Sequence, residues 1–597
     1  MGKRRAAVLI LLHVGMAAHI AHWKLAGKTL TPIEPSESMQ TLELGSLNAG
    51  FVFFAAAILL TFIFGRFVCG WGCHIVALQD LCGWMMKKIG IRPVAFRSRL
   101  LVYAPLVLAL YMFVWPTVHR VLWTDNPAPT LVADFSTTGF WDNFAGVILA
   151  IPFLIVCGFA TVYFLGAKGF CTYGCPYGGF FYPADRFSPG KIIMNPDRCD
   201  GNGYCTAVCT SNVRVHEEIQ QYGMVVDPGC MKCMDCVSAC PTNALSFGFA
   251  TPSVIKKLGK RKPPKHKRRY DLSWPEELAL AVIFITTFFA TRNLYGAVPM
   301  LMAMGLAGCG TYIIWKTCRT LRAPNVRLHK WQLCRDGAFQ PAGFGFLAFG
   351  TLITLLIAHS LLITIMSRLA IHDAIKPQLD RQALLAGAPP PLTDAQRTAI
   401  ERALSRFEFT APIWRGGIGL APNAGSDNTM ALLYLALDQR DSAQASLERV
   451  VNAIGPKAHM KGQALLDVAR IQMLRARTES SQAQADAALA TLERAARMSP
   501  NDPEIFENYA AALFQLRRDL DGAIANMRKA LDLDPTHVER WMRIAPLLLM
   551  KGDPDGAIDA LDQAVAHAPK EQRDTLIERG QSMLQQFGAP RQWTPGE

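Results

Sequence analysis

The chain has 597 residues and a formal net charge of +14, and 51% of its residues are apolar. Its positive mean hydropathy of +0.18 is unusual for a soluble protein of this length. The basic residues cluster beside long apolar stretches and not in an aromatic–basic groove, so the charge does not indicate nucleic-acid binding.

Seven apolar stretches follow in chain order, each long enough to cross a bilayer, for which about 20 apolar residues are needed. They lie near residues 6–26, 47–66, 100–118, 144–166, 276–292, 297–315 and 342–366. The first resembles a signal peptide, because Lys3, Arg4 and Arg5 precede it. It is long and has no clear cleavage site, so we expect an uncleaved anchor.

Loop charges orient these spans. The loops after the second, fourth and sixth spans are rich in Lys and Arg, whereas the loops near 27–46 and 119–143 hold more acidic than basic residues. The positive-inside rule then places the N-terminus and the basic loops in the cytoplasm and the C-terminal third outside. No cysteine lies in an expected outer loop or after Cys334, as expected if the thiols lie on the reducing side.

Two short loops share the pattern C-x3-C. Cys69 and Cys73 follow the second span, and Cys171 and Cys175 follow the fourth. Each loop has an aromatic residue two places after its first cysteine and then a glycine, which indicates a duplicated two-helix unit. Four thiolates brought together there could bind an iron–sulfur cluster or another metal, or act as a dithiol pair. Reduced thiols in tight turns are the alternative.

The segment between the fourth and fifth spans holds seven cysteines at ferredoxin spacing. Its second half reads C-x2-C-x2-C-x3-C-P, the bacterial pattern in which three cysteines bind one cluster and the fourth binds its neighbour. This crossed ligation gives one complete 4Fe–4S cluster the ligands Cys209, Cys230, Cys233 and Cys236. A tetrahedral zinc site is the alternative, but it needs four ligands and not seven.

The first half of the segment departs from the pattern. Asn202 stands in the place of the second cysteine, and Thr210 replaces the usual proline. A carboxamide is a poor iron ligand, because iron–sulfur sites prefer thiolates. We therefore expect a 3Fe–4S cluster, or a 4Fe–4S cluster with Asp200 or solvent at one corner; a decayed, empty site is the alternative. The cysteine ligands of this second cluster would be Cys199, Cys205 and Cys240.

Histidines also lie in the apolar stretches. Intramembrane ionisable groups are costly and often functional, so haem or quinone binding is a hypothesis for them. Hydrogen bonding to a neighbouring backbone carbonyl is the alternative, and no recognisable haem-attachment motif is present. The histidines that fall towards the outer leaflet are His19, His22, His119 and His359.

The C-terminal third contains helical repeats. Alanines seven apart and a closing proline recur with a period of 34 or 35 residues, which is typical of tetratricopeptide repeats. A weaker unit is expected near 428–456 and a capping helix near 571–587. Such arrays offer a concave protein-binding face, and a helical bundle without binding function is the alternative. The recurring positions are Ala488, Ala495, Pro500, Ala523, Ala530, Pro535, Ala557, Ala564 and Pro569.

The paired C-x3-C loops and the double ferredoxin motif together resemble a bacterial group of membrane polyferredoxins. This group includes the membrane ferredoxin of the periplasmic nitrate reductase system, the nitrous-oxide reductase maturation protein and the copper reductase of haem–copper oxidase assembly. The resemblance covers roughly residues 45–250 and implies functional C-x3-C cysteines, cytoplasmic clusters and electrons bound for periplasmic chemistry. This chain departs from the group at His74, Asn202 and Thr210.

We therefore predict a multi-domain protein: an α-helical polytopic membrane region with about seven spans, an inserted α+β double-cluster ferredoxin and an all-α tetratricopeptide-repeat solenoid. The expected domains are 1–185 (four membrane helices and both C-x3-C loops), 186–255 (ferredoxin), 256–370 (basic linker and three helices), 371–425 (linker) and 426–590 (periplasmic repeats).

The predicted function is electron transfer in the bacterial inner membrane. Electrons would pass from a quinol or cytoplasmic donor to a periplasmic redox or assembly protein held by the repeats. The chain would be an electron-transfer component and not an autonomous enzyme. Two alternatives remain open: a copper reductase that uses the C-x3-C cysteines, and a sensory or scaffold protein with structural clusters.

Overall fold

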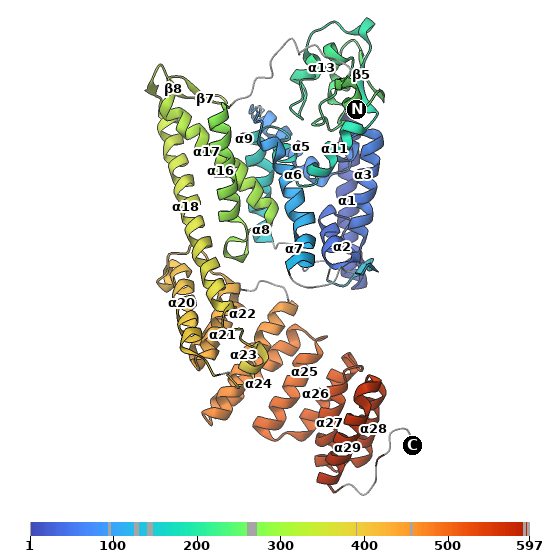
Figure 1. The fold of residues 1–597 in the computed structure, drawn as a ribbon, viewed down its shortest axis with the longest axis vertical. Coiled ribbons are helices and arrows are strands. Elements are labelled where there is room, and N and C mark those ends of the chain that lie inside the picture. The colour runs from blue at the N-terminus through green and yellow to red at the C-terminus, as the bar shows by residue number, and fades with distance from the viewer. Residues whose placement is uncertain are drawn as a thin grey trace. The chain divides into compact units, whose positions relative to one another are not determined.

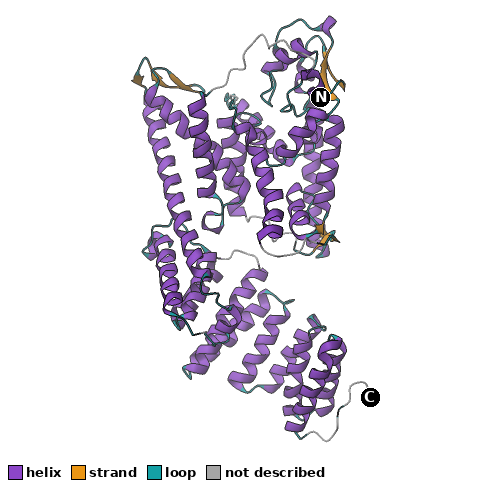
Figure 2. Ribbon diagram, viewed as in Figure 1, coloured by secondary structure: helices purple, strands orange, loops and turns teal. Residues whose placement is uncertain are grey.

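The computed structural model describes residues 2–93, 97–123, 130–139, 147–258, 272–389, 391–453, 458–588 and 593. The chain divides into two compact units, Met1–Thr364 and Ile365–Glu597 (Figure 1). Helices dominate both units, and the described strands are short and belong to the first (Figure 2). The mostly helical class predicted from the sequence is confirmed.

The first unit begins with helices and short loops that surround the C-x3-C motifs. These helices are α1 (Gly2–Ala26), α2 (Ser38–Leu44), α3 (Ala49–Phe64), α4 (Phe67–Trp71), α5 (His74–Lys88), α6 (Ala104–Ala109), α7 (Trp115–Trp123), α8 (Val147–Phe153), α9 (Thr161–Leu165), α10 (Gly169–Tyr173) and α11 (Gly178–Phe187). A π-helical turn joins α6 to α7, and another joins α8 to α9.

Four described helical stretches are long and apolar enough to cross a membrane, where seven were expected. They are α1, Leu101–Leu122, α16 (Trp274–Thr291) and α18 (Pro341–Ile375). The stretches expected near 47–66 and 144–166 form shorter apolar helices, Ala49–Phe64 and Ala150–Leu165. The stretch expected near 297–315 lies in α17 (Met300–Arg322), which ends in charged residues.

Glycines end the two helices that precede the C-x3-C loops. α3 begins after Asn48, whose side chain accepts a hydrogen bond from the backbone N–H of Phe51. It ends at Gly65, where φ is +70°, and α9 ends at Gly166, where φ is +103°. Glycine adopts positive φ without the steric cost that a Cβ would add. The chain therefore turns sharply after each helix into the short helix that carries the first cysteine of each pair.

Small residues allow α17 to pack closely against the end of the second hairpin. A Cβ added at Gly305 would lie 2.8 Å from a methyl group of Val156, and one at Gly308 would lie 2.9 Å from Leu165. Small residues at helix interfaces let backbones approach in this way in membrane proteins. This contact joins the later helices of the unit to the hairpin that carries the second C-x3-C loop.

The ferredoxin segment is an α+β insertion, as predicted. Strand β5 (Gly190–Met194) pairs antiparallel with β6 (Leu245–Phe249), with Ile192 opposite Phe247. Between the strands lie α12 (Tyr204–Ala207), α13 (Val215–Tyr222) and α14 (Asp235–Ala239), and α15 (Ser253–Leu258) follows. A second small sheet, which the sequence did not reveal, consists of β7 (Val326–Leu328), β8 (Trp331–Arg335) and β9 (Ala338–Phe339).

The second unit is an array of antiparallel helix pairs. Its helices are α19 (Arg381–Leu385), α20 (Asp394–Thr410), α21 (Ala424–Ala436), α22 (Arg440–Ala453), α23 (Ala458–Thr478), α24 (Gln482–Met498), α25 (Pro503–Ala512), α26 (Leu520–Leu533), α27 (Val538–Lys551), α28 (Pro554–His567) and α29 (Arg573–Gln586). All six alanines of the predicted repeat positions are fully buried between helices. The tetratricopeptide prediction is therefore confirmed, and α29 stands where the capping helix was expected.

Candidate functional site

The four cysteines assigned to the complete ferredoxin cluster line one enclosed pocket. Cys209, Cys230, Cys233 and Cys236 share its wall with apolar side chains such as Ile192. The loop can curl around the pocket because its backbone turns left-handed at intervening positions, with φ of +51° at residue 232 and +65° at residue 234. Burial raises the pKa of all four thiols, that of Cys209 to about 12, so a metal must displace protons to bind here.

Two of the other three ferredoxin cysteines are partly exposed to solvent. Cys205 is buried, but Cys199 and Cys240 are half-buried. Cys199 Sγ accepts a hydrogen bond from Gln220 Nε2 at 3.6 Å, and Cys240 Sγ accepts one from the backbone N–H of Ala244 at 3.3 Å. All three pack in the same apolar cluster as the complete group. The structure therefore places this group beside the first one but closer to solvent.

The side chain of Asn202 makes only local hydrogen bonds in this structure. Its Nδ2 donates to Asp200 Oδ2 at 2.9 Å, and its Oδ1 accepts from the backbone N–H of Tyr204 at 2.9 Å. Both Asn202 and Asp200 are exposed. The side chain at the missing-cysteine position therefore closes a local turn, as Asn commonly does.

The C-x3-C loops meet in one group of four thiols, of which Cys171 is buried and the other three are half-buried. Cys69 lies on α4 and Cys171 on α10, and Cys73 and Cys175 follow those helices directly. Burial raises the pKa of Cys73 to about 11 and of Cys175 to about 12, and the charges of the neighbouring thiols add to the shift. Burial and the charges of the other three thiols raise the pKa of Cys171 as well. The structure thus brings together the four residues that the duplication singled out.

Two buried cations accompany these thiols. Arg66 stands three residues before Cys69, and Lys168 stands three residues before Cys171. Their exposed fractions are 1% and 0%. The repeated offset is a signal that the sequence carries and that our sequence analysis missed. Both cations are costly to bury unless a negative group lies nearby.

Arg66 has no carboxylate partner within the part of the chain that the structure describes. Its guanidinium stacks on the Tyr182 ring, 4.4 Å from the centroid, and its Nη1 donates to the backbone oxygen of Pro228 at 3.3 Å. Burial alone would lower the pKa of Arg66, but the charges of Cys69, Tyr182 and Cys175 raise it. The positive charge of Arg66 is therefore directed at the thiol group.

Lys168 and Arg5 share the carboxylate of Asp80 in two ion pairs. Arg5, on α1, also donates from Nε to the backbone oxygen of Gly70 at 2.9 Å and forms a 3.3 Å ion pair with Asp235 of the ferredoxin. The sequence suggested only that Arg5 flanks a membrane anchor. The structure buries it instead, and it joins α1, the first C-x3-C loop and the ferredoxin.

A single layer of residues separates the four-thiol group from the complete ferredoxin pocket. Trp71 Nε1 donates to the backbone oxygen of Lys232 at 3.0 Å. Gly70 lies so close that a Cβ there would collide with the backbone oxygen of Met231. The Met231 side chain packs against Cys171 on one side and lines the ferredoxin pocket on the other. Electrons could therefore pass between the two groups without crossing solvent.

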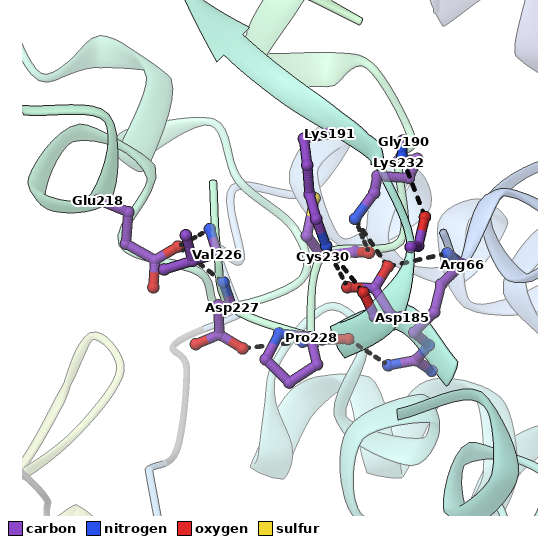
Figure 3. Close-up of polar contacts among 12 residues, drawn as sticks. Arg66, Asp185, Gly190, Lys191, Glu218, Val226, Asp227, Pro228, Cys230 and Lys232 are labelled. Carbon is purple, nitrogen blue, oxygen red and sulfur yellow. Dashed lines mark hydrogen bonds and ion pairs between the residues drawn. The ribbon is translucent and has the colours of Figure 1, made fainter. Parts of the chain in front are cut away.

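A buried carboxylate fastens this contact (Figure 3). Asp185, at the end of α11, accepts hydrogen bonds from Lys232 Nζ at 2.9 Å, Lys191 Nζ at 3.2 Å and the backbone N–H of Arg66 at 3.1 Å. Lys232 also donates to the backbone oxygen of Cys230 at 3.3 Å. Burial opposes the charge of Asp185, but the two lysines lower its pKa, so the carboxylate stays ionised. The network ties the helices to the ferredoxin loop.

The segment between α1 and α2 reaches the four-thiol group from the other direction. His74, next to Cys73, lies 3.7 Å from a carboxylate oxygen of Glu34. Phe54, in the middle of α3, packs against Tyr177 with ring centroids 5.8 Å apart, and Cys69 packs against the same cluster. The four-thiol group therefore has neighbours both in the ferredoxin and in the loop that holds Glu34.

The histidines proposed for haem or quinone make local contacts. His19 Nε2 lies 3.0 Å from the backbone oxygen of Leu30, and His22 Nδ1 lies 2.9 Å from Thr29 Oγ1. His119 lies beside the Trp115 ring. The His19 contact matches the backbone-carbonyl alternative, whereas His22 contacts a side-chain hydroxyl. Within the described residues, no three His, Cys, Asp or Glu side chains are placed to hold a metal ion.

Comparison with known proteins points to the same cysteine groups. A family model for a 4Fe-4S binding domain matches residues 49–92 and 148–195, which contain both C-x3-C loops, and a tetratricopeptide-repeat model matches residues 517–579. Ferredoxin-type protein NapH of Haemophilus influenzae is 24% identical over 233 residues, which cover 37% of this chain and 76% of NapH. These matches cover the membrane and repeat parts of the chain separately.

Two shorter matches have higher sequence identity. Protein NrfC of Escherichia coli is 35% identical over 102 residues, 16% of this chain and 44% of NrfC. The polyferredoxin-like subunit of an aliphatic sulfonate oxidoreductase from Pyrococcus furiosus is 36% identical over 77 residues, 11% of this chain and 43% of that subunit. Part of the chain is therefore similar to polyferredoxins, and tetratricopeptide repeats follow in its C-terminal third.

Proposed function

We propose that this protein is a membrane-bound electron relay with three iron–sulfur sites. The observation that carries the proposal is the contact between the four-thiol group and the ferredoxin pocket through Met231 and Lys232. Iron–sulfur clusters bound at these sites would carry one electron at a time. The chain would supply an ordered path: the ferredoxin pocket first, then the four thiols, then the loop that holds Glu34.

The ligand assignments form part of this proposal. The complete 4Fe–4S cluster would be held by Cys209, Cys230, Cys233 and Cys236, whose pocket is lined largely by apolar side chains. The second ferredoxin cluster would be 3Fe–4S or incompletely ligated, on Cys199, Cys205 and Cys240. The third, a 4Fe–4S cluster, would be held by Cys69, Cys73, Cys171 and Cys175.

The buried cations favour an anionic cluster at the four-thiol site. A cubane bound by four thiolates carries net negative charge, which Arg66 and Lys168 would neutralise in this low-dielectric setting. The copper-reductase alternative is less well supported, because the same two cations would repel an arriving metal cation. A purely structural or sensory role would leave the close approach of the two cysteine groups without a purpose.

The topology and the partner also remain proposals. We place the ferredoxin and the N-terminus in the cytoplasm and the repeats in the periplasm, because the loop charges follow the positive-inside rule. Arg5 and Asp235 form an ion pair, so the start of α1 and the ferredoxin belong to the same side. The electron donor would be a quinol or a cytoplasmic redox molecule.

The repeat unit offers a surface for the periplasmic partner. A cavity of about 620 Å³ lies among its helices and is bordered by arginines, of which Arg470 and Arg540 pair with the glutamates of the same wall. Concave faces of tetratricopeptide arrays bind protein segments. We propose that this face holds the redox or assembly protein that receives the electrons.

Vectorial electron transfer in sealed vesicles tests the proposal. Full-length protein is reconstituted with ferricyanide trapped inside, dithionite is added outside, and ferricyanide bleaching is followed. Wild-type protein should bleach the trapped acceptor, and Cys73→Ser and Cys175→Ser should slow bleaching at least about tenfold. Cys318→Ser, at an exposed cysteine outside all three groups, is the matched control. Equal rates in all variants would contradict the relay.

A further inference from the structure

A cavity beside the complete ferredoxin site has the properties of a ligand pocket. Its volume is about 440 Å³, and it lies between the ferredoxin, the second C-x3-C loop and the start of the Leu101–Leu122 stretch. Small-molecule pockets typically measure about 300–1,000 Å³. Nothing in the relay described above uses this space.

Two polar side chains in the wall have no partner. Ser211 Oγ and Asn212 Nδ2 are buried, and within the described residues neither forms a hydrogen bond. A buried polar atom without a partner costs about 1–3 kcal/mol, so native proteins rarely leave one without a function. Asn212 also has a φ of +61°, a conformation that side chains other than Gly, Asn and Asp rarely adopt. The two unpartnered atoms line the cavity, where a polar ligand would find them available for hydrogen bonding.

The pocket touches the candidate cluster site. Ser211 lines this cavity and also the pocket of Cys209, Cys230, Cys233 and Cys236. Gly229, next to Cys230, lines the cavity as well. A redox molecule bound here would therefore lie one residue away from the cluster ligands.

The lining chemistry selects the class of molecule. Five aromatic side chains, including Tyr103, Tyr182 and Trp274, supply flat apolar surface. Four arginines face three acidic residues: Arg97, Arg99, Arg186 and Arg214 against Glu217, Glu218 and Asp227. The wall is therefore net positive, and arginine forks suit phosphate.

The three acidic residues of the wall have partners inside the protein. Glu217 pairs with Arg214 at 3.1 Å. Glu218 accepts from the backbone N–H groups of Val226 and Asp227, as Figure 3 shows, and Asp227 accepts from Gly229. The Arg214–Glu217 pair removes one cation together with one anion, so the wall keeps a net positive charge from Arg97, Arg99 and Arg186 against Glu218 and Asp227.

We propose that this pocket binds a flavin mononucleotide, or a molecule of the same chemistry, as the entry point for electrons. The inference rests on the proposed cluster site next to it. A ferredoxin cluster takes single electrons, which a flavin can supply and a hydride-donating nicotinamide cannot. A reduced flavin would give two electrons, one at a time, to oxidised ferredoxin clusters, and its two protons would leave to solvent. A quinol is neutral and would not use the arginines.

Flavin fluorescence tests the binding step by itself. Oxidised, full-length protein in detergent is titrated into flavin mononucleotide, and quenching reports binding without any electron transfer. We expect saturable binding, and at least about tenfold weaker binding of riboflavin, which lacks the phosphate. Equal binding of the two flavins, no binding of either, or displacement by a short-chain quinone would overturn the proposal.

Variants of the wall separate a ligand role from a folding role. Asn212→Gly removes the amide but keeps the positive φ without strain, and should weaken flavin mononucleotide about tenfold. Asn212→Asp tolerates the same backbone and adds a negative charge, so it should weaken binding further. Arg186→Ser, at an exposed arginine of the rim, should weaken it by about fivefold. Unchanged affinity in Asn212→Asp would overturn the assignment.

The control is Arg322→Ser, an exposed arginine at the end of α17 and outside the pocket, which should bind flavin like wild type. Iron content equal to wild type in each variant shows that the ferredoxin site is intact. If flavin binds but the vesicle assay shows no electron transfer, the relay proposal is wrong and the flavin-pocket proposal holds. If transfer occurs without flavin binding, the pocket assignment fails and the relay stands.

Discussion

The two cysteine groups of the ferredoxin differ in how firmly the rest of the protein holds them. The complete group lines a largely apolar pocket, and its loop is tied to α11 and α4 through Lys232, Asp185 and Trp71. The incomplete group lies nearer to solvent, and its missing position is a local turn closed by Asn202. The difference suggests that the first group is part of the electron path and that the second is peripheral to it.

Removing one cysteine from each group should give the largest difference between the two ferredoxin sites, in iron content and in electron transfer. Cys236→Ser should lose about four irons and the EPR signal of the complete cluster, because a buried ligand is lost. Cys240→Ser should lose only the signal of the second cluster and keep transfer in vesicles. Iron analysis and EPR of both variants provide the measurement. Transfer that survives Cys236→Ser but not Cys240→Ser would reverse the assignment.

Asp185→Asn should destabilise the contact between the ferredoxin and the helices by about 3–5 kcal/mol, because it leaves two buried lysines without a negative partner. Thermal unfolding and limited proteolysis of the purified protein measure this. Asp197→Asn, at an exposed aspartate near the incomplete group, is the control and should change little. Similar losses in both variants would show that the anchoring is not specific to the complete site.

Much of this arrangement was predictable from the sequence. The remainder could not be predicted, and the reason is physical. The cysteine spacing and the alanine period are local patterns, so the ferredoxin motif and the helical repeats could be recognised. The contact of Asp185 with Lys232 joins residues 47 positions apart, the ion pair of Arg5 with Asp235 joins residues 230 apart, and no local pattern marks such pairs. Lys168 could have been found, because it repeats the offset of Arg66 from a cysteine.

The count of membrane spans was the weakest prediction. Apolar composition marks a stretch as buried from water, but it does not say whether lipid or protein surrounds it. Ala49–Phe64 is 16 residues long, and the chain then turns at Gly65 so that the cysteine loop packs back against Phe54. The sequence shows the apolar run but not this return.

Arg66→Gln sharpens the comparison between the ferredoxin and the four-thiol site. Removing a buried positive charge should make the nearby cluster harder to reduce, by on the order of 1 kcal/mol, which is about 40 mV for one electron. Redox titration followed by EPR measures the shift. Arg322→Gln, an exposed arginine on α17, should leave every potential unchanged. If only the reduction potentials of the ferredoxin clusters shift, Arg66 does not act on the four-thiol site.

Of these variants, Asn202→Cys should produce the smallest change, because it alters only the iron content and EPR signal of the second cluster. The new thiol would complete the first half-motif and convert the second cluster to a fully ligated 4Fe–4S form, which adds about one iron. The EPR signal of an oxidised 3Fe–4S cluster should disappear, and a signal of a reduced 4Fe–4S cluster should replace it. Asn202→Ser is the control. If Asn202→Cys and wild type give identical spectra, the second site is either already complete or empty.

The central claim is that the chain holds three clusters and that two of them, at the complete ferredoxin site and at the four-thiol site, form the electron path. Iron and acid-labile sulfide, counted on anaerobically purified full-length protein together with low-temperature EPR, test it most directly. The relay predicts about 11–12 irons per chain, with interacting signals from neighbouring clusters. A count of about 7–8 irons would mean that Cys69, Cys73, Cys171 and Cys175 hold no cluster, and the proposed path would then be interrupted at its middle step.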